Sequence, residues 1–276
     1  MMSTFSRHVL VGVCSLLLAL PVAAETTEAV AKAAASQAVK VELEPRAVEI
    51  IKAMSARLTE AQSIKFTALV SEESPSRLGP PLVYSTRSNV VLQRPNKLKV
   101  ITPGDGPSNE FYYDGKVIVT YAPAEDLAAF AEAPATITDA LKFAFDTAAI
   151  YFPFTDIIVD DPYEMISSDM ELAFYIGQSN TVGDTTTDMI AYANQGIFVQ
   201  AWIGSKDHLP RKMRAVFADD PLRLRHQVEF SDWQINGVAK DESFASEKAT
   251  SAKRIPLARP DQKAPTPATS ATGGKQ

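Results

Sequence analysis

The stretch FYYDGKVIVTY, Phe111–Tyr121, places two short apolar runs on either side of Asp114-Gly115. Asp-Gly between β-rich runs is a strong local signal for a tight β-hairpin. Pairing across that turn puts Phe111 opposite Ile118 on one face and leaves Tyr112 on the other. A sheet with one solvated face keeps that face polar. This hairpin is apolar on both faces, so the sequence predicts that both are covered.

Strand patterns dominate the chain on either side of this hairpin. In IKFTALV, the alternating residues Ile64, Phe66, Ala68 and Val70 share one face, and LVYSTRSNVVLQ alternates in the same way. Further candidate strands are MELAFYIG, TTTDMIAYAN, GIFVQAWIG, PRKMRAVFA and LRLRHQVEFSDW, with turn chemistry such as Asn194-Gln195-Gly196 between them. Consecutive strands with short turns predict an antiparallel meander.

Two segments have helical rather than strand periodicity. Pro45 suits a first helical position, and Val48, Ile51, Met54 and Leu58 follow at helical spacing. Between about residues 134 and 165 the alternation breaks down and the chain is rich in aromatic residues. The sequence therefore predicts an α+β fold: one strongly curved antiparallel sheet, preceded by a helix and carrying a helical insert in its middle.

The two ends of the chain differ from this central domain. Arg7, an apolar run and small residues before Glu25 are typical of a secretory signal peptide, residues 1–24, cleaved after Ala24. The single cysteine, Cys14, lies inside that segment. Residues 25–43 are Ala-rich and are interpreted as a disordered tether. Residues 246–276 are rich in Lys, Ala, Pro, Ser and Thr and are predicted to be disordered, which leaves one domain over 44–245.

Composition limits the classes of partner. The 276 residues carry 27 Lys+Arg and 33 Asp+Glu. Removing residues 1–24 removes one basic residue and no acidic one, so the exported chain has 26 basic and 33 acidic residues, a net charge of −7. Nucleic-acid binding needs a basic footprint, so a mildly acidic chain argues against that class of partner. The export signal predicts a periplasmic protein that is not integral to the membrane.

Motifs around the hairpin resemble a known superfamily. QRPNKLKV, residues 93–100, followed by DGKVIVTYAP, is similar to the RPN and DGK pattern of the LolA family of periplasmic lipoprotein carriers. The stretch from about residue 45 to 244 resembles more closely a family of uncharacterised predicted periplasmic proteins in the same superfamily, through PRAVEIIKAMSARL, FYYDGK and PFTDIIVDDPYEMI. KLKV stands where the carriers have an aromatic-rich stretch.

This resemblance implies an open half-barrel whose concave face is apolar and covered by helices. LolA-like members hold acyl chains there, whereas the regulator RseB uses the same fold in envelope sensing. Arg94 matches the arginine of the RPN motif, which is implicated in holding a lid over the cavity. A guanidinium can donate several hydrogen bonds in a fixed fork, to helix carbonyls or to a lipid phosphate. A solvated arginine at a strand end is the alternative.

Aromatic residues provide the other candidate ligand contacts. The second apolar face of the hairpin is either helix-covered core or the floor of a ligand groove. The same two alternatives apply to the aromatic residues of the insert and of GIFVQAWIG. The candidate ligand-binding and lid residues are Arg94, Phe111, Tyr113, Phe143, Phe145, Phe152, Phe154, Phe198 and Trp202.

Catalytic and metal-binding patterns are sparse. After the signal segment the chain has only His208 and His226 and no cysteine, and it contains neither a G-x-S-x-G nor an H-E-x-x-H motif. His226 falls on the apolar face of LRLRHQVEF, which favours a core histidine. The acidic run near Asp161-Pro162 favours a helix cap over a cation site. No enzyme, cofactor or metal is therefore predicted.

Two functions remain as expectations. In the first, the protein is a soluble periplasmic binding protein that holds a lipid, an acyl chain or another apolar ligand on the concave face. In the second, it is an RseB-type interaction module that contacts an envelope protein and holds no lipid. Basic residues of the last hairpin, among them Lys212 and Arg214, allow transient contact with a membrane surface in either case.

Overall fold

The computed structural model describes residues 42–104, 106–238 and 241–259, all within the compact unit formed by residues 41–276. The predicted signal peptide, nearly all of the predicted tether and the end of the predicted tail lie outside the described residues. The statements below concern the described part of this unit.

The chain forms two strand meanders joined by helices. The first part contains α2 (Pro45–Thr59), β1 (Ser63–Ser74), β2 (Leu82–Gln93), β3 (Lys97–Thr102), β4 (Asn109–Tyr113), β5 (Val117–Ala122) and β6 (Leu127–Glu132). The connection contains α3 (Ile137–Ala148), α4 (Thr155–Ile158) and α5 (Pro162–Ser167). The second part contains β7 (Met170–Ser179), β8 (Thr187–Asn194), β9 (Ile197–Gly204), β10 (Pro210–Phe217), β11 (Arg225–Ile235), α6 (Glu247–Ser251) and β12 (Lys253–Ile255).

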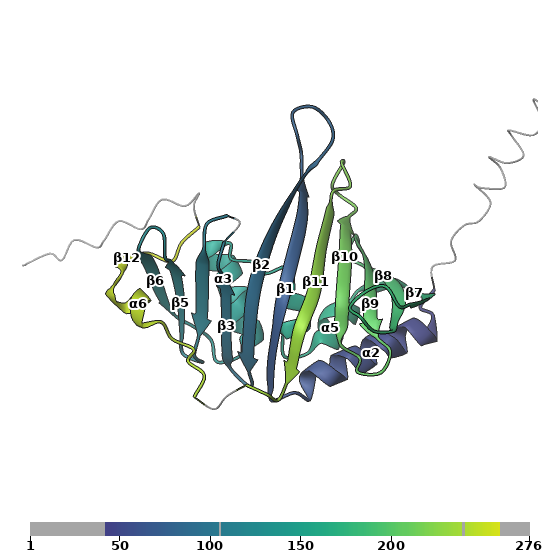
Figure 1. The fold of residues 1–276 in the computed structure, drawn as a ribbon, viewed down its shortest axis with the longest axis horizontal. Coiled ribbons are helices and arrows are strands. Elements are labelled where there is room, and N and C mark those ends of the chain that lie inside the picture. Colours follow the sequence, from purple (N-terminus) through teal and green to yellow (C-terminus); the bar gives the residue numbers. More distant parts are fainter. Residues whose placement is uncertain (1–41, 105, 239–240, 260–276) are drawn as a thin grey trace, which may run out of the picture. The chain divides into compact units, whose positions relative to one another are not determined.

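All strands belong to one 12-stranded sheet with the order β12-β6-β5-β4-β3-β2-β1-β11-β10-β9-β8-β7 (Figure 1). Neighbouring strands are antiparallel except for β12, which is parallel to β6. The first and last strands in this order do not pair with each other, so the sheet stays open. The predicted α+β fold, with one curved and mostly antiparallel sheet, is confirmed.

The strand order explains why the helical connection lies across the sheet. The first meander runs out to β6 near one edge, and the second begins with β7 at the opposite edge. The chain must therefore cross one face of the sheet between them. We call residues 137–167, which contain α3, α4 and α5, the insert. Figure 1 shows α3 and α5 behind the strands, on the face that we call the inner face.

The main hydrophobic core lies between the inner face and the helices. Alternation along β1 buries Ile64, Phe66, Ala68 and Val70, as the sequence predicts. Helix α2 begins at Pro45 and buries Ile51, Met54 and Leu58 in the same core, which confirms its predicted apolar stripe. In contrast, the far end of β2 extends beyond this core, so Leu82 and Tyr84 are exposed although they share a face with buried Val90.

The turn between β4 and β5 differs from the predicted one. Gly115 and Lys116 are its central residues, because the Asp114 N–H donates to the carbonyl of Val117 at 3.4 Å. Oδ1 of Asp114 accepts hydrogen bonds from the N–H groups of Lys116 and Val117, both at 2.9 Å. Gly115 has φ +96, which favours glycine, and a Cβ there would lie 2.5 Å from Asn96 Nδ2. Asp114 therefore caps the turn from outside instead of occupying it.

This change of turn also changes the register. Phe111 pairs with Thr120 and Tyr113 pairs with Ile118, so the predicted pairing of Phe111 with Ile118 is wrong by two residues (120 − 118). A shift of two keeps every side chain on its face, whereas a shift of one would reverse them. Phe111 and Tyr113 consequently stay on the inner face, and Tyr112 stays on the outer face as expected.

The outer apolar face of the hairpin is covered by the C-terminal segment. Tyr112, Val119 and Tyr121 form a second buried cluster with Ala249 of α6 and with Ala252. Of the two predicted alternatives, helix-covered core or groove floor, this face is helix-covered core, with α6 as the covering helix. Small alanine side chains let α6 lie close against the aromatic rings.

The described residues 246–259 therefore differ from the disorder predicted there. Ser246 caps α6 by accepting a hydrogen bond from the Ala249 N–H at 3.2 Å. Lys253 then starts β12 with a 3.0 Å hydrogen bond to the carbonyl of Asp126. Strand β12 covers the backbone edge of β6, which would otherwise offer unpaired hydrogen-bonding groups. The low-complexity composition conceals this short ordered segment.

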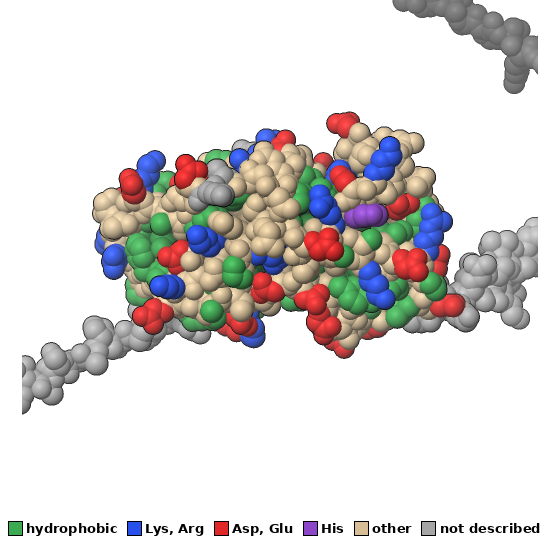
Figure 2. Space-filling view, turned by 90° about the horizontal axis from the view of Figure 1, so that it is seen from below, with side chains coloured by type: hydrophobic (Ala, Val, Ile, Leu, Met, Phe, Trp, Pro, Cys, Tyr) green, Lys and Arg blue, Asp and Glu red, His purple; other side chains and the backbone are tan. Residues whose placement is uncertain are grey.

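The surface carries mixed charge. On the face shown in Figure 2, acidic and basic side chains alternate and apolar side chains gather in patches between them. Several outward basic side chains are paired with acidic ones, as in the 3.1 Å contact of Lys212 with Glu229. No broad basic field dominates the view, in agreement with the acidic composition.

Candidate functional site

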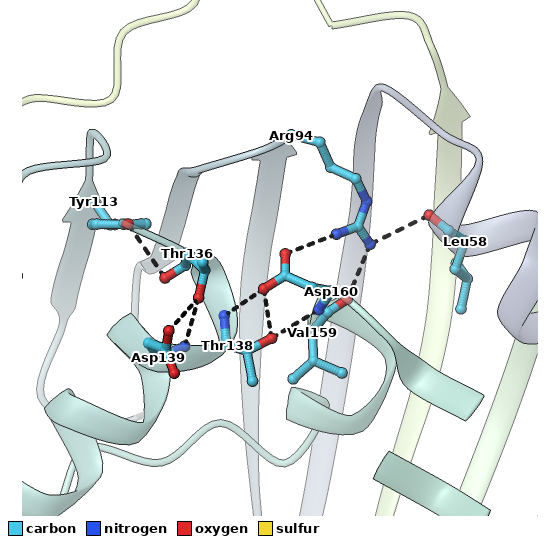
Figure 3. A network of polar contacts seen from close by, with 8 residues as sticks. All are labelled: Leu58, Arg94, Tyr113, Thr136, Thr138, Asp139, Val159 and Asp160. Atoms are coloured by element: carbon cyan, nitrogen blue, oxygen red, sulfur yellow. Dashed lines mark hydrogen bonds and ion pairs between the residues drawn. The ribbon is translucent and has the colours of Figure 1, made fainter. Parts of the chain in front are cut away.

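Arg94, at the end of β2, joins three separate elements. Its Nη2 donates to the carbonyl of Val159 at 3.0 Å and to the carbonyl of Leu58 at 3.4 Å, and its Nη1 lies 3.4 Å from Oδ1 of Asp160 (Figure 3). Burial lowers the pKa of this guanidinium, and the charge of Asp160 opposes that effect. The contacts tie the end of α2 and the stretch after α4 to the sheet.

Asp160 also fastens the start of α3. Its Oδ2 accepts hydrogen bonds from the Thr138 N–H at 3.1 Å and the Thr138 hydroxyl at 2.6 Å. In return, the Asp160 N–H donates to Thr138 Oγ1 at 2.9 Å. Nearby, Thr136 caps α3, and the hydroxyl of fully buried Tyr113 donates to the carbonyls of Pro134 and Thr136 (Figure 3). Partly buried polar groups thus hold the start of α3 and the stretch after α4.

The middle of the insert is held differently. We call residues 149–158 the roof segment. In the described part of the chain, no hydrogen bond or ion pair joins the roof segment to a strand. Its contacts with the sheet are apolar: Phe152 lies edge-on to Phe111 at 5.3 Å, Phe154 lies edge-on to Phe66 at 5.7 Å, and Ile157 and Ile158 are buried in the main core. Phe152 and Phe154 also stack on each other at 5.6 Å.

A cavity of about 320 Å³ lies between the roof segment and the second meander. Roof residues Phe154 and Ile157 form one side of it. The strands supply mainly apolar side chains, namely Tyr192, Ile197, Val199, Met213, Ala215, Phe217 and Val228. An adjoining cavity of about 180 Å³ shares Asp156, Tyr192, Ile197 and Val199 with it. Sites for small apolar ligands begin at about 300 Å³.

Polar groups in this cavity are few and mostly acidic. Asp156, Glu72 and His226 line it, and Nδ1 of His226 lies 3.9 Å from Oε1 of Glu72. The walls of the cavity desolvate the Asp156 carboxyl and raise its pKa above the ordinary 3.8. Burial, with the charge of Asp156, raises the pKa of Tyr192 well above 10.0. Burial and the nearby carboxylates also raise the pKa of Tyr151 to about 12.

A second cavity, of about 450 Å³, lies on the other side of the roof segment. Strands β4, β5 and β6 form its floor through Phe111, Thr120 and Ala129, and β12 closes one side with Ile255. Tyr151 lines both this cavity and the first one. The roof segment therefore divides the space under the insert into two apolar compartments that meet at one exposed tyrosine.

The remaining predicted residues lie at different places. Phe143 of α3 is partly buried against the core, whereas Phe145 is 47 % exposed and lies under the guanidinium of Arg259. On β9, the cavity residues Ile197 and Val199 alternate with Phe198, so Phe198 and Trp202 face away from the cavity. Lys212 lies over the Trp202 ring at 5.6 Å. We leave this outer pair out of the candidate site.

Sequence reasoning did not select the polar residues of the first cavity. Asp156 and Tyr192 were not singled out, because an aspartate in an aromatic-rich insert and a tyrosine in a strand carry no motif. Asp161, in contrast, caps α5 as predicted, accepting a hydrogen bond from the Glu164 N–H at 3.0 Å. His226 lies on the apolar face as predicted, at the edge of the cavity and in edge-on contact with Phe217 at 5.1 Å. The core position that this pattern favoured is wrong, because the His226 side chain is 36 % exposed.

Two further observations concern metals and membranes. The described residues contain no cluster of His, Cys, Asp or Glu that could hold a metal ion. Within the same residues, none of the helices has both the length and the apolar character needed to span a bilayer.

An open, mostly antiparallel sheet with helices packed on its inner face defines an α+β half-barrel. The chain belongs to the DUF2092 family, described as "Predicted periplasmic protein", whose model matches residues 47–258. This match confirms the resemblance to a family of predicted periplasmic proteins and the periplasmic localisation. No curated protein matches the sequence.

Solved structures of similar fold include proteins from several bacteria. An uncharacterized conserved protein from Thermus thermophilus is 10 % identical over 76 % of this chain and 99 % of its own, with a TM-score of 0.45. The lipoprotein LppX from Mycobacterium tuberculosis is 12 % identical over 72 % of this chain and 100 % of its own, with a TM-score of 0.45. A LolA superfamily protein from Nitrosomonas europaea is 10 % identical over 73 % of this chain and 98 % of its own, with a TM-score of 0.37.

Proposed function

We propose that this protein is a periplasmic binding protein that holds an apolar ligand, such as an acyl chain, between the roof segment and the inner face. The observation that carries the proposal is the pair of apolar cavities under the roof segment, of about 320 and 450 Å³. Burying an alkyl chain there stabilises the complex by about 0.8 kcal/mol per CH₂ group.

The contacts of the insert suggest how a ligand enters. Tyr113 holds the residues just before the insert and Arg94 the stretch after α4 through partly buried hydrogen bonds, while the roof segment is held by apolar contacts, chiefly those of Phe152, Phe154 and the buried isoleucines of α4. Ring contacts are not directional in the way hydrogen bonds are, and an apolar ligand can replace them. We infer that the roof segment lifts to admit the ligand while the ends of the insert stay attached.

Binding rather than catalysis is proposed for this site. No serine, threonine or cysteine lines the 320 Å³ cavity, so His226 has no hydroxyl or thiol nucleophile of those kinds to activate there. Its polar contact, at 3.9 Å, is with Glu72.

Native mass spectrometry tests this function. The protein is purified from a periplasmic extract without detergent, and its mass is compared with that of Ala215→Trp. Ala215 lines the 320 Å³ cavity, so a tryptophan there fills the space that a ligand would occupy. We expect adducts of lipid or acyl mass on the natural protein and their loss in the variant.

Val216→Trp is the matched control, because Val216 follows Ala215 on β10 and its side chain points to the outer face. This control should keep the adducts. A bare mass for the natural protein, together with no uptake of added lipid, would refute the proposal.

One observation favours an interaction module as the second candidate. The hairpin between β1 and β2 projects beyond the rest of the sheet (Figure 1) and exposes apolar side chains. Leu78 is 92 % exposed, and Leu82, Val83 and Tyr84 are also exposed. Exposed apolar patches mark interaction surfaces. Leu78→Ser combined with Val83→Ser should abolish crosslinking to an envelope partner without changing lipid adducts; unchanged crosslinking would exclude this hairpin as the contact.

A further inference from the structure

The 320 Å³ cavity contains polar groups that no protein partner satisfies. The carboxylate of Asp156 forms no hydrogen bond or ion pair with another residue in the described ranges. Tyr192 is 3 % exposed, and its buried hydroxyl has no hydrogen-bond partner there either. Both residues line the cavity and also the adjoining one. Asp156 is exposed, whereas the Tyr192 hydroxyl is buried. Buried polar groups are normally paired, so this hydroxyl calls for a partner that is not part of the chain.

A third unpaired atom lies in the adjoining cavity. Asn194 donates from Nδ2 to the carbonyl of Ile166 at 2.7 Å, which fixes the orientation of its amide. Its Oδ1 is buried and has no partner in the described residues. Oδ1 can only accept hydrogen bonds, as can an ionised carboxylate, whereas a hydroxyl can do both. The three unpaired groups are therefore mainly acceptors.

The charged side chains that line the two cavities are acidic, apart from the imidazole of His226. No lysine or arginine lines either of the two cavities. The other titratable side chains that face Asp156 are Glu72, Tyr151, Tyr192 and His226, and the imidazole already lies beside Glu72. Asp156 is exposed and lines both cavities, so its carboxylate presents a negative charge to a ligand that enters them. A ligand with a carboxylate or phosphate end would meet like charge.

We propose that this cavity selects an apolar ligand whose polar end is a protonated amine, held by Asp156 with Tyr192 and Asn194 as further acceptors. This inference rests on the proposed function and specifies its ligand class. An ammonium group carries one positive charge and up to three N–H donors and has no acceptor. It thus supplies what the cavity lacks. The apolar walls accommodate the attached chain.

Three probes of equal chain length test this selection. Dodecylamine, dodecanol and dodecanoate share their alkyl chain and differ only in the polar end. Each is titrated calorimetrically, below its micelle concentration and near neutral pH, into protein from which bound lipid has been removed. We expect dodecylamine to bind at least about tenfold more tightly than dodecanol, as a charged hydrogen bond implies, and dodecanoate to bind most weakly.

Two nearly isosteric variants locate the effect. Asp156→Asn removes the charge and should weaken dodecylamine binding at least about tenfold while leaving dodecanol within about twofold. Tyr192→Phe keeps the ring and should weaken dodecylamine binding several-fold. Asp146→Asn is the control, because Asp146 also lies in the insert but pairs with Lys142 on the surface, outside both cavities. Asp146→Asn should leave the affinity for each of the three probes unchanged.

The outcomes separate this inference from the proposed function. If the three probes bind equally, or dodecanoate binds best, or Asp156→Asn leaves dodecylamine affinity unchanged, amine selection is wrong while apolar binding stands. If none of the probes binds, both the proposed function and this inference fail.

Discussion

At the scale of single residues, Asp156 combines an exposed position with a carboxyl pKa raised by desolvation. Its side chain opens into a cavity, yet the cavity walls remove enough water to raise the pKa of its carboxyl. Hydrogen bonds to the ionised form would lower that pKa, and in the described residues none is made. The desolvated carboxyl therefore opposes folding once it ionises, unless something binds to it.

Asp156→Asn should reveal this effect as a change in the pH dependence of stability. A folded-state pKa above 3.8 means that the folded protein binds this proton more tightly than the unfolded chain does. The stabilisation that this group contributes is complete at pH values below its pKa in the unfolded chain. It is lost as the pH rises through its pKa in the folded protein. The ligand-free variant should therefore gain stability over the natural protein as pH rises, measured by urea unfolding at several pH values. Parallel stability profiles for the two proteins would contradict this.

At the scale of elements, Arg94 connects parts that are distant in sequence. From the end of β2 it reaches the last turn of α2 and the backbone after α4, and it pairs with Asp160. One planar guanidinium makes these contacts together because its N–H groups diverge in fixed directions. An ammonium at the same place cannot keep the same geometry.

Arg94→Lys should consequently loosen the insert although the charge is kept. We expect a loss of about 1–3 kcal/mol in the free energy of unfolding, since buried hydrogen bonds to Val159 and Leu58 are weakened. Hydrogen exchange followed by mass spectrometry should speed up in residues 155–160 more than in β8. Lys142→Ala, on the exposed face of α3, is the control and should leave exchange there unchanged. Equal exchange in Arg94→Lys and the natural protein would rule out the anchoring role.

Helix α6 provides a second prediction at this scale. Ala249 is fully buried against the outer aromatic cluster, whereas Thr250 beside it is exposed. Ala249→Asp should destabilise the protein by at least about 2 kcal/mol, because it buries an unpaired charge beside Tyr112 and Tyr121. Thr250→Asp should lower the free energy of unfolding much less, because Thr250 is exposed. Thermal unfolding of both variants measures the difference, and equal midpoints would mean that α6 does not cover the hairpin in solution.

The elements also differ in how well the sequence predicts them. Helix α2 and the inner face of β1 follow clear periodicities, and both are predicted. Strand β6, LAAFAE, is missed because alanine has little preference for strands and gives no alternation. The register of the β4–β5 hairpin is missed because Asp114 can either enter the turn or cap it, and only packing against Asn96 and the neighbouring strands decides between these options.

The candidate site was predicted only in its apolar part. Phe111, Phe152 and Phe154 do line the cavities, because large side chains in a strand and a helical insert face the space between them. Asp156 and Tyr192 belong to separate elements, and their proximity follows from the insert crossing the sheet, which local patterns do not encode. Phe198 and Trp202 were also predicted as ligand contacts, but they lie on the face of β9 away from the cavity. Aromatic residues on one face of a strand do not by themselves indicate which face of the sheet lines the cavity.

At the scale of the described unit, the topology places a cover over an apolar surface. The insert has to cross the whole inner face because it connects opposite edges of the sheet. Its helical ends bury their apolar sides, but the shorter roof segment between them leaves space on both sides. Cavities under a crossing connection are therefore a consequence of strand order, and the polar side chains that line those on the second meander include Asp156, Tyr192, Asn194, Glu72 and His226.

Tyr151 lies where the two compartments meet. It lines both cavities and is 59 % exposed, so Tyr151→Ala should change the free energy of unfolding by less than about 1 kcal/mol while opening a passage between them. Longer alkylamines should then gain affinity over dodecylamine, because more of their chain is buried. Phe152→Ala next to it removes a buried ring and should instead cost about 3–5 kcal/mol. Calorimetric titration with alkylamines of increasing length measures the first effect and urea unfolding the second. An unchanged length preference in Tyr151→Ala would show that the ligand occupies one compartment only.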